Sequence, residues 1–260
     1  MTTNISNRNV AVKIPNSFKD VEIKKFVQQI EALILFKYHP NILTIIGWTL
    51  YGDIPVLITE LAETNLLNYV QTISNHQNFK KFSLQVLWQI SNALAYVTSH
   101  KMIHRDVACR NILCMDGGIV KLADFDLCCF CDKNGIFKDT MNNKLPIKWL
   151  SIEALTNGIF SEKSDVWAFG ILCYEIFSFG SIPYDSMSPI EMMQFLEADK
   201  RLEKPDGTPD YIYDLMIKCW NKESKNRPNF IQINKKITSK LENETFKYGY
   251  LTLKKVFAKP

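Results

Sequence analysis

The sequence has 260 residues, of which 47% are hydrophobic and 22% charged, and its net charge is +4. This length and composition predict one large globular domain or two lobes with a substantial core, and they exclude a disordered chain. The mild positive charge is compatible with a polyanionic ligand such as a nucleotide, but it gives no reason to expect a nucleic-acid partner.

The N-terminal part of the chain alternates between strand-like and helical patterns. Residues 10–14 alternate as a strand does, and apolar residues recur at helical spacing over 19–36. Two more strands are predicted over 42–48 and 56–59, followed by a hinge over 60–62. We therefore expect a small lobe of three strands and one helix.

Beyond the hinge the patterns become mainly helical. A long amphipathic helix is predicted from Leu84, and two short strands are predicted over 112–115 and 119–122. Helical patterns then continue from 150 to 241, and the tail over 247–260 is predicted to be weakly structured. This order predicts a small β-rich lobe, a hinge and a larger helical lobe.

Two features bear on the location of the chain. The longest apolar run, 166–177, is too short to cross a bilayer and contains Glu175, so it predicts a buried helix and no membrane-spanning segment. The seven cysteines lack the spacing of a disulfide framework, which favours reduced thiols in the cytoplasm. Cys128, Cys129 and Cys131 lie close together, but no histidine completes a zinc site there.

Three motifs in order indicate phosphoryl transfer. The stretch 103–111 places Asp106 and Asn111 five residues apart, directly after the long helical pattern. In phosphoryl transfer such an Asp positions the substrate hydroxyl and accepts its proton, while the Asn holds a metal ion on the phosphates. The stretches 121–125 (KLADF) and 145–149 (LPIKW) follow in the order and at the spacing that this chemistry requires. Three motifs in the required order are hard to explain by chance.

These motifs resemble the catalytic domain of protein kinases, and within them the receptor-type tyrosine kinases such as the fibroblast growth factor receptors. The resemblance implies an α+β, two-lobed protein-kinase-like fold with a truncated small β-rich lobe and a complete helical large lobe. It implies a kinase domain over 1–243, divided into 1–62 and 63–243, and a C-terminal tail over 244–260. It also implies ATP and Mg²⁺ as cofactors and a protein tyrosine as substrate.

The resemblance assigns roles to single residues. Asp106 would be the catalytic base, with Arg110 and Asn111 beside it, and Asn111 and Asp124 would be the Mg²⁺ ligands. Lys13 would pair with the α- and β-phosphates of the nucleotide. The residues expected to line the nucleotide site are Ala11, Lys13, Thr59, Glu60, Ala62 and Leu113.

Two further groups of residues follow from the resemblance. Ala108-Cys109-Arg110 and the platform residue Pro146 resemble the tyrosine-kinase versions of their motifs and favour tyrosine as the substrate. In the large lobe, Glu153 and Arg227 would form a structural ion pair, and Asp165 would anchor the backbone before Asp106. Removing one partner of such a buried pair costs about 3–5 kcal/mol.

Three departures concern the nucleotide site. The first glycine is Gly47, so no glycine-rich loop precedes Lys13 and the backbone cradle for the phosphates is not expected. Gln29 stands where the helix glutamate should pair with Lys13, and an amide supplies no charge. Asp126 replaces the glycine of the metal motif, where an added carboxylate could repel Asp124 or recruit extra cation.

A fourth departure concerns regulation. The segment 124–153 contains no tyrosine, and the usual positions of the paired loop tyrosines fall on Ile136 and Phe137. Arg105 would therefore have no phosphotyrosine to bind, and we expect Ile136 and Phe137 to pack onto the large lobe and hold the loop in one conformation. Tyr250 in the tail would suit a phosphotyrosine-reading partner.

Three functions remain open at this point. The chain could be a protein-tyrosine kinase, possessing Lys13, Asp106, Asn111 and Asp124. It could be a pseudokinase, a binding or scaffold module that keeps the fold without useful turnover, as the departures favour. A small-molecule kinase is disfavoured by Pro146 and the complete helical lobe. The chain could also derive from the cytoplasmic part of a membrane receptor.

Overall fold

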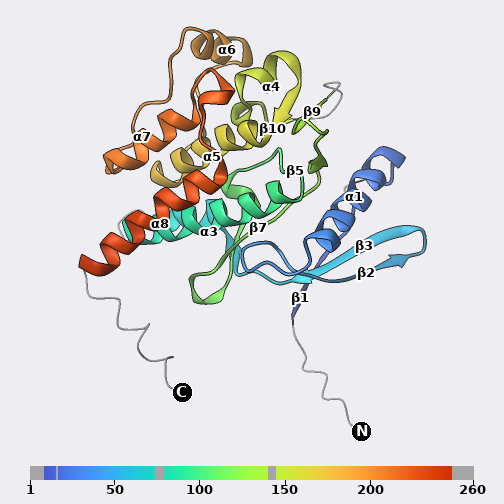
Figure 1. The fold of residues 1–260 in the computed structure, drawn as a ribbon. Coiled ribbons are helices and arrows are strands. Elements are labelled where there is room, and N and C mark those ends of the chain that lie inside the picture. The colour runs from blue at the N-terminus through green and yellow to red at the C-terminus, as the bar shows by residue number, and fades with distance from the viewer. Residues whose placement is uncertain (1–8, 16, 74–78, 140–144, 248–260) are drawn as a thin grey trace.

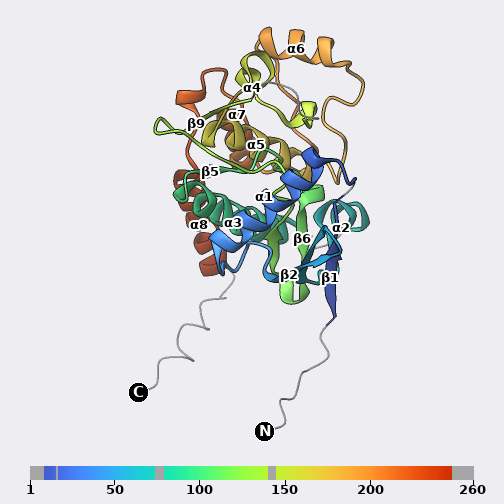
Figure 2. The same ribbon diagram turned by 90° about the vertical axis from the view of Figure 1, so that its right-hand side faces the viewer.

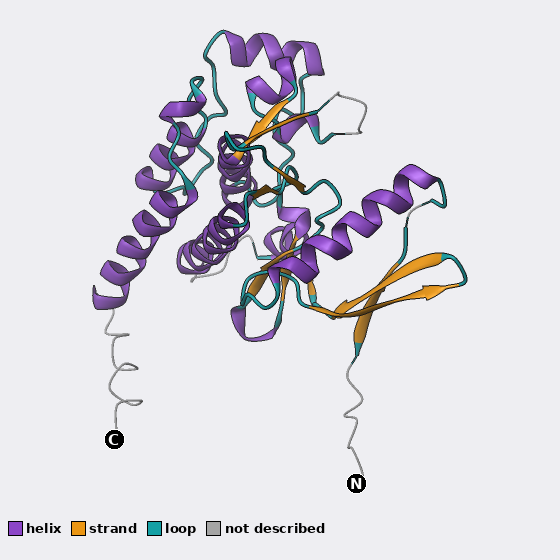
Figure 3. Ribbon diagram, turned by 45° about the vertical axis from the view of Figure 1, so that its right-hand side comes forward, coloured by secondary structure: helices purple, strands orange, loops and turns teal. Residues whose placement is uncertain are grey.

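A computed structural model describes residues 9–15, 17–73, 79–139 and 145–247, and these form two lobes (Figure 1). The β-rich small lobe lies to one side, and the helices of the large lobe occupy the other. Figure 3 separates the two by colour, with the longest strands gathered beneath one helix of the small lobe. The predicted α+β, two-lobed architecture is confirmed.

The small lobe is a three-stranded antiparallel sheet with one helix packed on it. Its elements are β1 (Val10–Lys13), α1 (Asp20–Phe36), β2 (Ile45–Tyr51) and β3 (Ile54–Glu60). The strand order is β1-β3-β2, so β1 lies at an edge of the described sheet, with Val10 opposite Glu60 and Lys13 opposite Leu57. The predicted three strands and one helix are therefore present in the described residues.

One predicted boundary in the small lobe is wrong. The strand expected over 42–48 begins only at Ile45 and continues to Tyr51. Residues before it pair with the large lobe instead, because the Leu43 N–H donates to the Leu122 carbonyl at 2.9 Å, and Ile42 bridges to Leu122. This segment therefore ties the two lobes together.

The large lobe contains most of the helices. They are α2 (Leu66–Thr72), α3 (Phe79–Ser99), α4 (Ile152–Asn157), α5 (Glu162–Phe177), α6 (Pro189–Glu197), α7 (Asp210–Cys219) and α8 (Phe230–Lys247). Short 3-10 turns are η1 (Cys109–Asn111), η2 (Asp116–Gly118), η3 (Ile147–Trp149) and η4 (Ser224–Asn226). β1 begins and α8 ends toward the same side of the molecule (Figure 2). The predicted tail lies outside the described residues from 248 onward.

Short strands connect these helices. They are β4 (Thr64–Asn65), β5 (Met102–Ile103), β6 (Ile112–Cys114), β7 (Val120–Leu122), β8 (Cys129–Phe130), β9 (Ile136–Lys138) and β10 (Ile159–Ser161). The predicted pair over 112–115 and 119–122 corresponds to β6 and β7. The purely helical prediction after Trp149 is wrong at β10, which pairs antiparallel with β9. Segments this short show no periodicity in sequence and depend on their tertiary partner.

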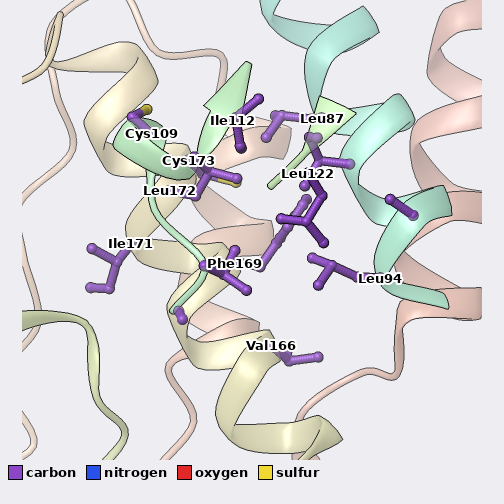
Figure 4. Packing of buried hydrophobic residues seen from close by; sticks show 14 of the residues in the cluster. Leu87, Leu94, Cys109, Ile112, Leu122, Val166, Phe169, Ile171, Leu172 and Cys173 are labelled. Atoms are coloured by element: carbon purple, nitrogen blue, oxygen red, sulfur yellow. The ribbon is translucent and has the colours of Figure 1, made fainter. Parts of the chain in front are cut away.

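Helix α5 forms the centre of the core and is buried on nearly every side. Figure 4 shows Cys109 of η1 beside Leu172 and Cys173 of α5, within the main hydrophobic cluster. A Cβ atom on Gly170 would lie 2.5 Å from Trp220 Nε1 and 2.9 Å from Cys219 Cβ, so only glycine permits this approach of α7. α5 is therefore a rigid base for the loops above it.

Three observations concern the cysteines, possible metal ligands and possible membrane spans. All seven cysteines are free thiols. Among the described residues, no group of His, Cys, Asp and Glu side chains is arranged to hold a metal ion by three or more protein ligands. No helix in the described part of the chain has the length and hydropathy needed to span a bilayer.

Candidate active site

The catalytic loop, residues 104–111, is anchored on α5. The buried carboxylate of Asp165 accepts hydrogen bonds from the backbone N–H groups of His104 at 2.6 Å and Arg105 at 2.9 Å. Burial raises the pKa of Asp165, and these hydrogen bonds oppose that effect. They also hold Arg105 at a φ of 69°, which a non-glycine residue rarely adopts. The structure thus brings Asp165 to the contact expected of it.

Asp106 lies between two other predicted site residues. The Asn111 Nδ2 group donates to Asp106 Oδ2 at 2.7 Å and to the Asp106 carbonyl at 2.9 Å. Arg110 forms an ion pair with Asp106 Oδ1, and its guanidinium stacks 4.3 Å from the centroid of the Trp149 ring. Both carboxylate oxygens are therefore fixed in direction, as a base that must meet a hydroxyl requires.

A second charged cluster joins the lobes. Lys13 Nζ lies 2.9 Å from Asp124 Oδ1 and 3.1 Å from Asp126 Oδ1, so one ammonium bridges two carboxylates. Burial acts to lower the pKa of Lys13, but the two carboxylates outweigh it and the pKa is raised. Burial and the charge of Asp124 together raise the pKa of Asp126. The ammonium thus holds together two groups that would otherwise repel each other.

Gln29 reaches this cluster but does not make the expected contact. Its Nε2 donates to Asp124 Oδ1 at 3.3 Å, and Lys13 is held by the carboxylates instead. The reason is electrostatic, because a neutral amide competes poorly with two carboxylates for an ammonium. The Gln29 side chain is buried, and its Oε1 has no hydrogen-bond partner among the described residues.

The donor set fits a magnesium ion. Asp124 and Asp126 supply hard carboxylate oxygens, which Mg²⁺ prefers, and Lys13 is the cation they share in this structure. Asn111 binds Asp106 through its amide nitrogen, so the oxygen arm of the amide is directed elsewhere. The orphaned Gln29 Oε1 beside Asp124 is a further sign that this region suits a cation.

The expected nucleotide-lining residues lie at the junction of the lobes. Ala11 pairs with the buried Thr59 across β1 and β3, and Leu113 lies in β6 opposite Asn65. Ala62 follows the end of β3.

Glu60 differs from the other hinge residues. Its carboxylate accepts from Lys121 Nζ and from the Thr44 N–H, both at 2.6 Å. Its side chain therefore braces the hinge against β7.

The segment after the metal motif is held by a contact that sequence reasoning missed. Arg105 and Asp139 form an ion pair whose side chains are only 4% and 3% exposed. The Arg105 guanidinium also lies 4.8 Å from the Phe137 ring centroid and 4.2 Å from that of Phe160. Arg105 thus meets a carboxylate of this chain. The prediction for Phe137 is confirmed, but Ile136 stays exposed at 39%, because its side chain points to the opposite face of β9.

The C-terminal end of the segment 124–153 is held by the predicted ion pair of Glu153 and Arg227. Arg227 donates to both oxygens of Glu153, at 2.6 and 2.8 Å, and its guanidinium stacks on the Trp167 ring. Pro146 begins the platform residues 146–149, and its carbonyl accepts from the Trp149 N–H at 2.9 Å. Sequence reasoning missed Asp139 and the roles of Trp149 and Glu175.

Comparisons with known proteins agree with this geometry. Residues 2–237 match the family model described as protein tyrosine and serine/threonine kinase. The chain is 34% identical over 236 residues to the megakaryocyte-associated tyrosine-protein kinase of Rattus norvegicus, covering 91% of this chain and 49% of that protein. It is 35% identical over 210 residues to tyrosine-protein kinase FRK of Homo sapiens (80% and 42%) and over 231 residues to tyrosine-protein kinase SRK3 of Spongilla lacustris (86% and 67%). The chain thus spans less than half of the rat and human relatives.

Proposed function

Because the chain belongs to the protein tyrosine and serine/threonine kinase family, we propose that it transfers the γ-phosphoryl group of ATP to the hydroxyl of a protein tyrosine. The observation that carries this proposal is the cluster of Asp106, Arg110 and Asn111. It holds a carboxylate in a fixed direction beside two residues that can orient a substrate. The similarity to three tyrosine-protein kinases supports tyrosine as the acceptor.

Each charged residue then has a defined task. Asp106 orients the tyrosine hydroxyl and accepts its proton late in the transfer, while Arg110 keeps the carboxylate turned toward the hydroxyl. Lys13 leaves its two carboxylates to bind the phosphate oxygens of the nucleotide. Asp124, Asp126 and Asn111 would hold Mg²⁺, which supplies neutralisation of the charge on the phosphates.

The finer classification is part of the same proposal. Ala108-Cys109-Arg110 and Pro146 favour tyrosine over serine or threonine, and the length of the segment 124–153 favours a receptor-type subgroup. The seven free thiols fit a cytoplasmic setting, where ATP is also available. We also propose that a phosphotyrosine-reading partner binds at Tyr250, a residue that lies outside the described part of the chain.

The test is phosphotransfer to a poly-Glu/Tyr polymer by the full chain with Mg²⁺ and ATP. Asp106→Asn should lower turnover by about 10²-fold or more, because general-base positioning contributes about 10²–10⁴. Asp206→Asn makes the same chemical change at an exposed turn and should leave turnover as it is. Full activity of Asp106→Asn would remove Asp106 from the mechanism.

A second candidate function has its own support. Lys13 is doubly held by Asp124 and Asp126, and Gln29 supplies no competing charge. These features favour a pseudokinase that binds nucleotide or a partner without useful turnover. Calorimetric titration with Mg·ATP beside the polymer assay separates the two functions, because binding without phosphotransfer supports the pseudokinase.

A further inference from the structure

One acid in the core lacks a cationic partner among the described residues. Glu175 lies in α5 and is 3% exposed. Its Oε2 accepts one hydrogen bond from the Cys109 backbone N–H and one from Trp149 Nε1, both at 3.0 Å. Both donors are neutral. A carboxylate in such a setting retains a proton more readily than an exposed one, and burial raises the pKa of Glu175 to about 7.

The two donors belong to the two segments that must meet around a substrate tyrosine. Cys109 lies in the catalytic loop between Asp106 and Asn111, and Trp149 ends the platform residues. The Trp149 ring carries the Arg110 guanidinium on its face, and Arg110 pairs with Asp106. One buried carboxylate therefore reaches the candidate base by two routes, through the loop backbone and through the indole ring.

We propose that Glu175 is a positioning residue whose ionisation draws the catalytic loop and the platform together. This inference rests on the proposed phosphotransfer function. When Glu175 is ionised, both of its hydrogen bonds are charge-assisted, and such bonds are about twice as strong as neutral ones. When Oε1 carries a proton, Oε2 still accepts both bonds, but as a neutral acceptor. The two hydrogen bonds therefore keep their geometry on protonation but become weaker.

The surroundings of the carboxylate give the direction of the effect. Arg110 favours the ionised form, while Asp106 disfavours it, and the nearby Cys109 thiol is kept neutral because burial raises its pKa. On the packed elements nearby, Lys148 of η3 lies 3.9 Å from Asp185, and α2 has Tyr69 but no charged residue. Acidification below about pH 7 should therefore protonate Glu175 and loosen the Trp149–Arg110–Asp106 chain.

The first measurement needs no turnover. In the ¹⁵N-labelled full chain, the indole N–H signal of Trp149, assigned with Trp149→Phe, should shift with a midpoint near pH 7 as the hydrogen bond gains charge. In Glu175→Gln, which has the shape of the protonated acid, the signal should not titrate. Glu197→Gln on the exposed face of α6 should titrate like the wild type. If Glu175→Gln fails to fold, the Cys109 amide signal in Trp149→Phe provides the same titration.

The second measurement is the pH profile of phosphotransfer to poly-Glu/Tyr. We expect the kcat of the wild type to fall about five- to tenfold below pH 7 toward the value of Glu175→Gln. This fall corresponds to about 1 kcal/mol of weaker hydrogen bonding by Glu175. The KM for ATP should not follow it. A Trp149 signal that does not titrate, or a kcat ratio of wild type to Glu175→Gln that is constant with pH, would overturn the proposal. Absence of phosphotransfer at every pH would sink the proposed function instead, and the Trp149 and Cys109 titrations alone would then decide the inference.

Discussion

Replacing Asp139 with alanine should destabilise the chain more than any surface substitution. The ion pair of Arg105 and Asp139 is almost completely buried, and the guanidinium is enclosed by the rings of Phe137 and Phe160. Removing one partner of a buried pair typically costs about 3–5 kcal/mol, because the other charge stays in the interior without compensation. The two aromatic faces offset about 1 kcal/mol of this loss. We therefore expect the free energy of unfolding to fall by about 2–4 kcal/mol.

The assay is urea denaturation of the full chain, comparing midpoints at an unchanged slope. The matched control is Asp210→Asn, which breaks the exposed pair of Lys204 and Asp210 and should shift the midpoint far less. A double variant, Arg105→Met with Asp139→Leu, removes both charges and should recover most of the lost stability. A loss below about 1 kcal/mol in Asp139→Ala, or a double variant no more stable than the single one, would refute the buried-charge reasoning.

Three other predictions follow from the site and its supports. Chelation of Mg²⁺ should weaken ATP binding at least about tenfold in a titration, because Asp124 and Asp126 would then repel the triphosphate with only Lys13 to offset them; equal affinity with and without metal would contradict this. Glu153→Ala should lower the free energy of unfolding by about 3 kcal/mol in urea, because it removes the carboxylate that neutralises the buried guanidinium of Arg227 and leaves that charge with backbone carbonyls and the Trp167 ring; an unchanged midpoint would count against it. The pKa of Glu175 rises from 4.5 to about 7 on folding, so the stability present below pH 4.5 is lost as pH rises through 7. The wild type should therefore lose roughly 3 kcal/mol relative to Glu175→Gln across that window, and parallel stability–pH curves would be inconsistent with a buried, titrating Glu175.

Local motifs made much of the site predictable from sequence. Asp106, Asn111 and Arg110 lie within one short loop, so their meeting depends on few intervening residues. The pair of Glu153 and Arg227 was also expected, because each lies in its own recognisable motif. Helix α1 and strand β1 were found from periodicity alone.

The missed contacts depend on tertiary structure. The bond between Lys13 and Asp126 joins residues 113 positions apart, and no local pattern favours it over the expected partner Gln29. The pair of Arg105 and Asp139 depends on β9 and β10, whose pairing brings Phe137 against Phe160. A structural role for Glu175 could have been predicted from the sequence, since a single acid inside an otherwise apolar helical run requires a buried partner.

The edge position of β1 has a consequence for how the chain behaves at high concentration. An edge strand offers unpaired N–H and C=O groups on which a neighbouring molecule can add a strand, and proteins usually blunt this with a free charge. On β1 the outward side chains Val10 and Val12 are apolar and 40% and 62% exposed. The one charge of the strand, Lys13, is turned inward to Asp124 and Asp126. In the described chain, therefore, the strand that carries Lys13 is one of the two sheet edges open to self-association, β2 being the other, and a ligand that draws Lys13 away would leave the β1 edge equally unprotected.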